Sequence, residues 1–219
     1  MNILEADSIA LSFQSRNILS GAYIKLEGGK ITGLIGRNGY GKSCLMKIIY
    51  GTLEPAFKSV RYNGKHLVKP YLKKGLLQYL PQFDFVPRHL RLEAILHMYD
   101  VPYTALTSYF PEFAHRGKER LGNLSGGQAR IITTFALIAA PVKFALLDEP
   151  FTHLMPVHIE VMRSLIQDTA AKHKGFLITD HLYDHILELC DVYYYLDQQT
   201  TRALTREQLQ EKAYFTRKE

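Results

Sequence analysis

A glycine-rich loop of eight residues carries the most specific chemistry in this sequence. It reads Gly36-Arg37-Asn38-Gly39-Tyr40-Gly41-Lys42-Ser43, and Cys44 follows it. Glycines let successive backbone N–H groups turn toward phosphate oxygens, and a helix that begins after the loop directs its positive end at the same anion. Lys42 is expected to reach the β- and γ-phosphates, and the Ser43 hydroxyl is expected to contact Mg²⁺. We therefore predict that residues 36–44 bind a nucleoside triphosphate.

Two adjacent carboxylates end an apolar run further along the chain. The run is Phe144-Ala145-Leu146-Leu147-Asp148-Glu149-Pro150. At the end of a buried strand beside a phosphate loop, Asp148 is suited to hold Mg²⁺ through water, and Glu149 is suited to polarise a water that attacks the γ-phosphate. Alone, the Asp-Glu-Pro sequence also fits a solvated turn. Together with the phosphate loop, it predicts hydrolysis of the nucleotide.

A second anion cradle is predicted at Leu124-Ser125-Gly126-Gly127-Gln128. Ser125 precedes a helical run at 129–139, where a serine commonly caps the helix. Its hydroxyl, the glycine amides and the helix dipole together suit a phosphate. One small domain has little use for two cradles on one nucleotide. We therefore expect a head-to-tail dimer in which a second chain supplies the other cradle.

The elements that must position these motifs follow from hydrophobic periodicity. Ile9, Leu11 and Phe13 alternate with small residues, and the pattern returns at 22–26 after an expected turn at Ser20-Gly21, which predicts antiparallel strands. A strand at 30–35 leads into the phosphate loop, and a helix is expected at 44–50. The runs 144–147, 176–179 and 192–196 are continuously apolar, as in parallel strands covered on both faces. A helix at 157–172 separates two of them, which indicates an α/β core.

Two further helices, at 91–99 and 103–110, are predicted between Gln82 and Leu124, where no buried strand adjoins them. They indicate a short helical insertion. After Asp197 we expect only a short tail.

Composition limits the class of protein. The chain has 219 residues, 47% of them hydrophobic, and a net charge of +6, which favours an anionic partner such as a nucleotide, nucleic acid or a membrane surface. Cys44 and Cys190 are far apart in apolar surroundings and are expected to be reduced thiols. The longest apolar tract, 131–147, is interrupted by Pro141 and Lys143. Neither a signal peptide nor a membrane-spanning helix is predicted.

Taken together, these motifs resemble those of the ABC (ATP-binding cassette) ATPase family over nearly the whole chain. In family terms the phosphate loop is Walker A, Asp148-Glu149 is Walker B, and residues 124–128 are the signature motif. The resemblance implies that Gln82 of the Q-loop senses the γ-phosphate and metal, that His181 is the switch histidine contacting the γ-phosphate, and that Phe13 stacks on adenine. From the residues alone, Phe13 is also compatible with a core role, and the His181/His185 spacing superficially suggests a metal site.

The resemblance also implies a fold. It is an α/β fold with a P-loop NTPase core, whose mostly parallel sheet is flanked by helices, together with an N-terminal antiparallel β subdomain and a short α-helical subdomain. Residues 1–219 are expected to form a single ABC ATPase domain. Its nucleotide-binding core would comprise 1–82 and 124–219, and its helical subdomain 83–123.

The function implied is that of the ATP-binding and hydrolysing subunit of an ABC transporter, with ATP and Mg²⁺. Its expected partners are a transmembrane permease subunit and a second ABC ATPase, as a homodimer or heterodimer, at the cytoplasmic face of the cell membrane. No nucleic acid is expected. Phe83, Phe85 and Pro87 are candidates for the permease groove, unless the rings pack within the helical lobe. The rival function is that of a soluble ABC ATPase in iron–sulfur assembly or DNA repair; a P-loop kinase would leave the signature unused.

The sequence departs from the family pattern at one position that bears on activity. Met155 occupies the place of the D-loop aspartate, which in the family helps align the two halves of the dimer. A thioether carries no charge and is a poor hydrogen-bond acceptor. We therefore hypothesise slower hydrolysis, or altered coupling between the two sites. Arg37 and Tyr40 also differ from common family residues, at positions of the loop that tolerate variation.

Overall fold

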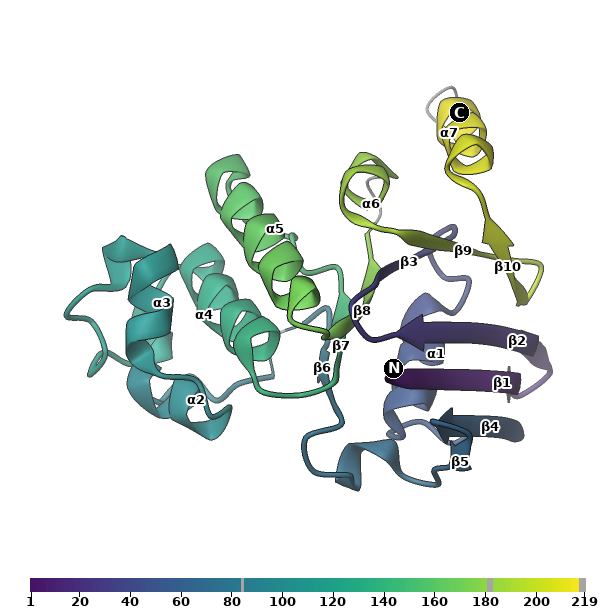
Figure 1. The fold of residues 1–219 in the computed structure, drawn as a ribbon, viewed down its shortest axis with the longest axis horizontal. Coiled ribbons are helices and arrows are strands. Elements are labelled where there is room, and N and C mark those ends of the chain that lie inside the picture. The colour runs from purple at the N-terminus through teal and green to yellow at the C-terminus, as the bar shows by residue number, and fades with distance from the viewer. Residues whose placement is uncertain (84, 181–182, 217–219) are drawn as a thin grey trace.

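The computed structural model describes residues 1–83, 85–180 and 183–216, with side chains up to residue 212. Within them, the chain forms two sheets and surrounding helices (Figure 1). The strands are β1 Ile3–Phe13, β2 Arg16–Glu27, β3 Ile31–Ile35, β4 Phe57–Tyr62, β5 Lys65–His66, β6 Leu77–Leu80, β7 Phe144–Asp148, β8 Gly175–Thr179, β9 Val192–Asp197 and β10 Thr200–Leu204. The helices are α1 Lys42–Tyr50, α2 Leu92–Met98, α3 Tyr103–Tyr109, α4 Gly126–Ala139, α5 Pro156–Ala171, α6 Tyr183–Leu189 and α7 Arg206–Thr216.

The larger sheet has the strand order β10-β9-β3-β8-β7-β6. All of its pairs are parallel except β9 with β10. Every residue of β3, β7 and β8 is buried, which is why these strands read as continuous apolar runs. Because the carboxyl ends of parallel strands meet at one edge, the segments that follow β3, β6, β7 and β8 converge there.

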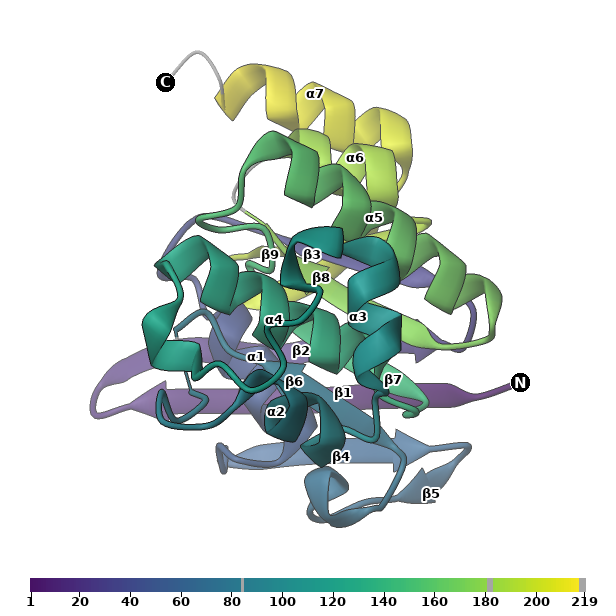
Figure 2. The same ribbon diagram turned by 90° about the vertical axis from the view of Figure 1, so that its left-hand side faces the viewer.

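The two faces of this sheet are covered by different partners. On one face, Leu34 and Leu177 share a core with Leu45 of α1 and with Leu4 of the antiparallel sheet, whose order is β2-β1-β4-β5. Helices α2 to α5 lie beyond the other face, and in Figure 2 they stand in front of the strands. The expected mostly parallel α/β core with an antiparallel sheet is confirmed.

The two helices of the predicted insertion lie within one residue of their expected ends at 91–99 and 103–110. They pack on α4 through a cluster of aromatic and aliphatic side chains. Phe110 contacts Phe113 and Phe135 of α4, with ring centroids 6.4 and 6.1 Å apart. The segment before the signature is therefore attached to the signature helix itself.

Two expectations about local structure are wrong. The turn between β1 and β2 lies at Gln14-Ser15, whereas Gly21 sits inside β2. There the register steps from Ile9↔Ala22 to Leu11↔Leu19, so that two residues of β2 face one of β1. Such a bulge favours a left-handed residue, and Gly21 has φ 66°.

The second error concerns the residues after Asp197, which are not a short tail. Strand β10 pairs with β9 and contacts β2, and Tyr23 N–H donates to Thr201 Oγ1. Leu209 of α7 is fully buried. The segment 200–212 is therefore part of the folded body.

Candidate nucleotide site

The phosphate loop joins β3 to α1, and its glycines have structural reasons. Gly41 caps α1 with φ 101°, and a side chain there would approach Ile18 Cγ2 to 2.8 Å. At Gly36, a Cβ atom would lie 2.5 Å from the carbonyl oxygen of Leu196. The backbone thus closes around a space that only glycine permits.

Lys42, the first residue of α1, is held inside this loop. Its side chain is 7% exposed, and Nζ donates to the carbonyl oxygens of Gly36 at 2.7 Å and Arg37 at 3.3 Å. Burial lowers the pKa of Lys42, while Glu149 and Asp148 oppose that shift. A cation buried among carbonyls at a helix N-terminus suits a polyphosphate that neutralises it.

A cavity of about 640 Å³ lies beside the loop. It collects residues predicted from separate motifs: Phe13, Asn38, Gly39, Gly41, Lys42, Ser43, Cys44, Gln82 and Glu149, with Ile18 as an addition. The fold therefore brings Phe13, the phosphate loop, the Q-loop glutamine and the Glu149 carboxylate to one place. Phe13 is 49% exposed, so the core role left open for it is wrong.

Asp148 ends β7 and is 2% exposed. Thr179 Oγ1 donates to its Oδ1 at 2.6 Å, and the Tyr79 hydroxyl donates to its Oδ2 at 3.1 Å. Burial, followed by the Asp148 carboxylate, raises the pKa of Tyr79. The tyrosine hydroxyl thus stays protonated and remains a donor.

Glu149 follows in a left-handed conformation, with φ 50°. Such a backbone is uncommon for a residue other than glycine and persists only where its surroundings hold it. Here its N–H donates to Thr179 Oγ1 at 3.1 Å, and its Oε2 accepts from Gln82 Nε2 at 2.9 Å. The backbone kink turns the carboxylate toward the cavity.

Arg130, on the second turn of α4, hydrogen-bonds to the backbone of Asp148 and Glu149. It is 4% exposed, and its guanidinium donates to the carbonyl oxygens of Pro81, Asp148 and Glu149 at 3.0, 3.2 and 2.9 Å. Hydrogen bonds from Nη1 and Nη2 to three carbonyl oxygens offset part of the cost of burying this cation. Arg130 therefore ties the signature helix to the Q-loop and to the catalytic turn.

The signature motif forms the N-terminus of α4. Ser125 is the N-cap: its Oγ accepts from Gln128 N, and its N–H donates to Gln128 Oε1, both at 3.3 Å. The predicted helix cap is thereby confirmed. Adding a Cβ to Gly127 would place it 2.9 Å from the His153 carbonyl oxygen, so the D-loop packs directly against the motif.

The cradle at Ser125 faces a different cavity from the one beside Lys42. This second cavity, of about 600 Å³, is lined by Glu112, Ser125, Gly127, Gln128, His153, Met155 and His158. No residue that the structure describes lines both cavities. Within the described part of one chain, therefore, Ser125 and Lys42 do not converge on a common ligand.

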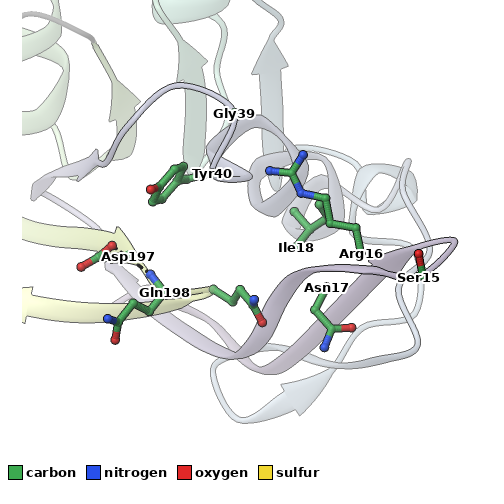
Figure 3. A pocket seen from close by; sticks show the side chains of 9 residues that line it. Ser15, Arg16, Asn17, Ile18, Gly39, Tyr40, Asp197 and Gln198 are labelled. Atoms are coloured by element: carbon green, nitrogen blue, oxygen red, sulfur yellow. Dashed lines mark hydrogen bonds between the residues drawn. The ribbon is translucent and has the colours of Figure 1, made fainter.

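Tyr40, at a variable position of the phosphate loop, lines neither of these cavities. It lines a third cavity together with Asp197 at the end of β9, Gln198 of the β9–β10 turn and Arg16 of β2 (Figure 3). This third cavity measures about 540 Å³. The bulky ring thus leaves the space beside Lys42 open.

His181, the expected switch histidine, lies outside the described residues. Its neighbours show what flanks it: His185 Nδ1 is 3.0 Å from Asp180 Oδ2, and the His185 ring packs on Phe151. Among the residues with described placement, no three His, Cys, Asp or Glu side chains are grouped to hold a metal ion. Cys44 and Cys190 are free thiols, as expected.

Sequence reasoning missed three side chains of the site: Tyr79, Arg130 and Thr179. Each lies next to a recognised motif, but a phenol, a guanidinium and a hydroxyl at these positions form no pattern of their own. Their roles depend on strand register and helix packing, which only coordinates supply.

Comparison with known proteins agrees with the motifs. A family model described as ABC transporter matches residues 19–152, more than half of the chain. An uncharacterized ABC transporter ATP-binding protein of Rhizobium meliloti is 30% identical over 201 residues, covering 86% of this chain and 74% of its own. The lipopolysaccharide export system ATP-binding protein LptB of Haemophilus influenzae is 28% identical over 206 residues, covering 87% and 85%.

Solved structures agree on the fold. A structure described as the ATP binding subunit of an ABC transporter superposes with a TM-score of 0.84 at 22% identity, covering 96% of this chain and 94% of the other. A nucleotide-free ATP-binding cassette from an ABC transporter gives 0.83 at 20% identity, covering 98% and 96%. In the described residues, no helix is long and apolar enough to cross a membrane. The chain belongs to the ABC transporter family, as one of its ATP-binding and ATP-hydrolysing subunits.

Proposed function

We propose that this chain works as half of an ATP-driven clamp, in which two nucleotides are held between two chains facing opposite ways. Lys42 and the phosphate loop of one chain bind one side of each ATP. Ser125 and the signature amides of the other chain bind the opposite side. Closure on ATP and reopening after hydrolysis would drive a permease in the membrane.

The observation that carries this proposal is the separation of the two anion cradles. The cavity at Lys42 and the cavity at Ser125 share no lining residue, yet each ends in the N-terminus of a helix. Helix N-termini attract anions, and two of them on one γ-phosphate would stabilise its charge better than one. A second copy or a related chain, turned by a two-fold axis, supplies the missing half.

Within each site, different residues have different roles in ATP hydrolysis. Glu149 is positioned as the group that polarises the attacking water, and Gln82 holds its carboxylate. Lys42 balances the charge of the transferred phosphoryl group. His181 is proposed to contact the γ-phosphate, and Phe13 presents an exposed ring on which adenine can stack.

The donor set at this edge of the sheet fits Mg²⁺. Ser43 and Gln82 line the cavity with a hydroxyl and an amide, and the buried Asp148 carboxylate interacts electrostatically with Lys42 of the same cavity. Magnesium prefers hard oxygen ligands, few of them from protein, and keeps several waters. We infer that Ser43 would hold the ion directly and Asp148 through water. When bound, the ion neutralises charge on the phosphates.

Mixing two inactive variants tests the two-chain site. Lys42→Ala damages the phosphate loop, and Ser125→Arg blocks the signature cradle, so neither variant alone has an intact site. In a mixed pair, one site combines the two lesions, while the other combines the intact Lys42 and the intact Ser125. We expect the mixture to recover ATPase activity, measured as phosphate release.

Two outcomes would contradict this scheme. If a Ser125→Arg chain is as active as the wild type, the signature is not part of the site. If the mixture stays inactive although Glu149→Gln chains form an ATP-dependent dimer in size-exclusion chromatography, each site is built differently from our proposal. A Glu149→Gln chain that stays monomeric with excess ATP excludes the homodimer and directs the search to a different ABC subunit.

We infer further that residues 83–123 act as the helical subdomain and carry the permease contact, with 1–82 and 124–219 as the nucleotide-binding core. Phe83 and Phe85, just after Gln82, are 78% and 41% exposed, so they do not pack within the helical lobe. Exposed aromatic rings favour docking of an apolar partner. A short helix of the membrane subunit would place the chain peripherally at the cytoplasmic face.

Co-purification tests the permease contact. The wild-type chain should be recovered from detergent-solubilised membranes together with a polytopic protein, and Phe83→Ser with Phe85→Ser should lose that protein while ATP binding is retained. Met98→Ser is a matched control, because Met98 is an exposed apolar residue of the same lobe at 67%. Recovery of the chain only from the soluble fraction would contradict a role in transport.

A further inference from the structure

Two hydroxyl groups hold the carboxylate of Asp148 from opposite sides. Thr179 Oγ1 donates to Oδ1 at 2.6 Å, and the Tyr79 hydroxyl donates to Oδ2 at 3.1 Å. Thr179 is fully buried and Asp148 nearly so. Each carboxylate oxygen can accept about two hydrogen bonds, so each keeps acceptor capacity beyond the one hydroxyl that it binds.

This arrangement follows from the sheet. Strand β7 lies between β6 and β8, and Asp148 is the register partner of Thr179. Tyr79 is the partner of Leu146, two residues before Asp148. Residues two apart on a strand share a face, so the long tyrosine side chain can reach forward to the carboxylate. The two strands that flank β7, namely β6 and β8, thus each provide one hydrogen-bond donor to Asp148.

The Thr179 hydroxyl has a second contact, with the catalytic turn. It accepts the Glu149 N–H at 3.1 Å while its own hydrogen is directed at Asp148. A hydroxyl has one hydrogen and two lone pairs, so both contacts are satisfied at once. The Glu149 N–H is shared with the Thr179 carbonyl oxygen, also at 3.1 Å. Thr179 therefore contacts both the Asp148 carboxylate and the left-handed Glu149 backbone.

Tyr79 is itself held in place by the helix that follows the phosphate loop. Its ring lies 5.6 Å from that of Tyr50 in α1, with the planes tilted by 41°. Tyr50 in turn packs on Tyr71 at 5.8 Å. The hydroxyl that reaches Asp148 is thus positioned by the same helix that presents Lys42 and Ser43 to the nucleotide.

We propose that Tyr79 and Thr179 are positioning residues that orient the Asp148 carboxylate for the divalent cation bound with ATP. The inference rests on the proposed nucleotide site and adds to it two residues that act through Asp148. Groups that hydrogen-bond a metal-binding carboxylate typically alter metal affinity by about 10- to 100-fold when removed. Affinity for the phosphates themselves, which Lys42 and the loop amides bind, should change little.

The experiment separates these two quantities. Mn²⁺ is used as the probe, because the sharp electron paramagnetic resonance signal of the free aqueous ion falls as the ion binds, which gives the bound amount by difference. It is titrated into the full chain with a non-hydrolysable ATP analogue, and binding of the analogue is measured separately in EDTA. Thr179→Val and Tyr79→Phe should each raise the Mn²⁺ concentration at half-saturation by about tenfold or more, with analogue binding in EDTA preserved.

Matched variants distinguish positioning from packing. Thr179→Ser keeps the hydroxyl and should restore Mn²⁺ affinity. Thr201→Val removes a hydroxyl that both accepts from and donates to the Tyr23 backbone, away from the site. Tyr50→Phe removes a hydroxyl from the neighbouring ring. Both should retain the wild-type midpoint.

Three outcomes would overturn the inference. They are an unchanged Mn²⁺ midpoint in both Thr179→Val and Tyr79→Phe, a Thr179→Ser chain as impaired as Thr179→Val, or a Tyr50→Phe chain as impaired as Tyr79→Phe. If Thr179→Val does not fold, the Mn²⁺ midpoints of Tyr79→Phe and Thr179→Ser still test the inference. If the wild-type chain binds no analogue even with Mn²⁺, the proposed function fails first, and the wild-type titration shows this.

Discussion

The Nε2 amide of Gln82 donates to Oε2 of Glu149 across 2.9 Å. Gln82 directly follows the short connection from β6, at the start of the segment that leads into α2 and α3. The carboxylate that we propose to be catalytic is thus held by a residue at the start of the proposed helical subdomain. Movement of that subdomain would change where the carboxylate points.

Removing this amide should slow hydrolysis. A hydrogen bond to a charged group contributes about 1.5–3 kcal/mol, so Gln82→Ala should lower kcat by about tenfold or more. Gln78→Ala, in β6 four residues earlier, is the control. Steady-state phosphate release measures both, and equal rates for Gln82→Ala and the wild type would show that Glu149 needs no such support.

Replacing Lys42 should weaken nucleotide binding. Its buried ammonium is the cation nearest to the expected phosphates, and losing a charged hydrogen-bond donor should raise the Kd for ATP by about 10- to 100-fold. Lys42→Met keeps the length of the side chain without the charge. Lys47→Met is the control, because Lys47 is an exposed lysine on the same helix. Calorimetric titration with ATP should give a raised Kd for Lys42→Met and the wild-type Kd for Lys47→Met.

Met155 is the N-cap of α5 and makes no side-chain cap hydrogen bond. Aspartate and asparagine are among the best N-caps, so Met155→Asp and Met155→Asn should each raise the free energy of unfolding by about 1 kcal/mol. Met155→Leu supplies no hydrogen-bond acceptor and should leave the free energy of unfolding unchanged. Urea denaturation measures the difference, and equal stability of all four chains would exclude capping at this position.

The same substitution should also change hydrolysis, for a separate reason. Met155 is 58% exposed and lines the signature cavity, where a second chain is expected to pack. A carboxylate there, as in the family pattern, should raise the ATPase rate. Because Met155→Asn caps the helix equally well, it controls for stability. An unchanged rate in Met155→Asp would refute the hypothesis that methionine slows this ATPase.

Lys174 should make stability depend on pH in the alkaline range. Its Nζ donates to the carbonyl oxygens of Ile138 and Ala140 at the end of α4, and burial lowers its pKa to about 8 from 10.5. Between these values the unfolded chain binds more protons at this amine than the folded chain does. The free energy of unfolding should therefore rise with pH through this window, by up to about 3 kcal/mol.

The comparison that isolates Lys174 is Lys174→Met, since all other groups titrate alike in both chains. Urea midpoints from pH 7.5 to pH 10.5 should rise more steeply in the wild type. At every pH the variant should be less stable, because two carbonyls lose a donor. Parallel pH profiles would mean that the ammonium is not desolvated in the folded chain.

The sequence predicted those features that depend on local pattern. The phosphate loop, the strand before Asp148 and the cap at Ser125 are each readable from a few adjacent residues, and the structure has them where they were expected. The turn near Gly21 was misplaced because a glycine in a bulge and a glycine in a turn leave the same sequence signal. Strands β4 and β6 were missed because their burial depends on β1 and β7.

The contacts around Asp148 and Glu149 were beyond the reach of sequence patterns. Tyr79 and Thr179 approach Asp148 only because β6 and β8, far from β7 in the chain, pair with it on its two sides. Arg130 reaches the catalytic turn because α4 crosses behind it. These are long-range relationships between ordinary side chains, and no spacing rule identifies them.

Arg130 has a consequence for how two such chains would share work. The helix that carries it begins at Ser125, which is proposed to touch the opposite chain's nucleotide, while its guanidinium grips the Glu149 carbonyl of its own. In the proposed dimer, a shift of this helix toward one nucleotide would also move the Glu149 turn at the other. Hydrolysis at the two sites would then be coupled through Arg130.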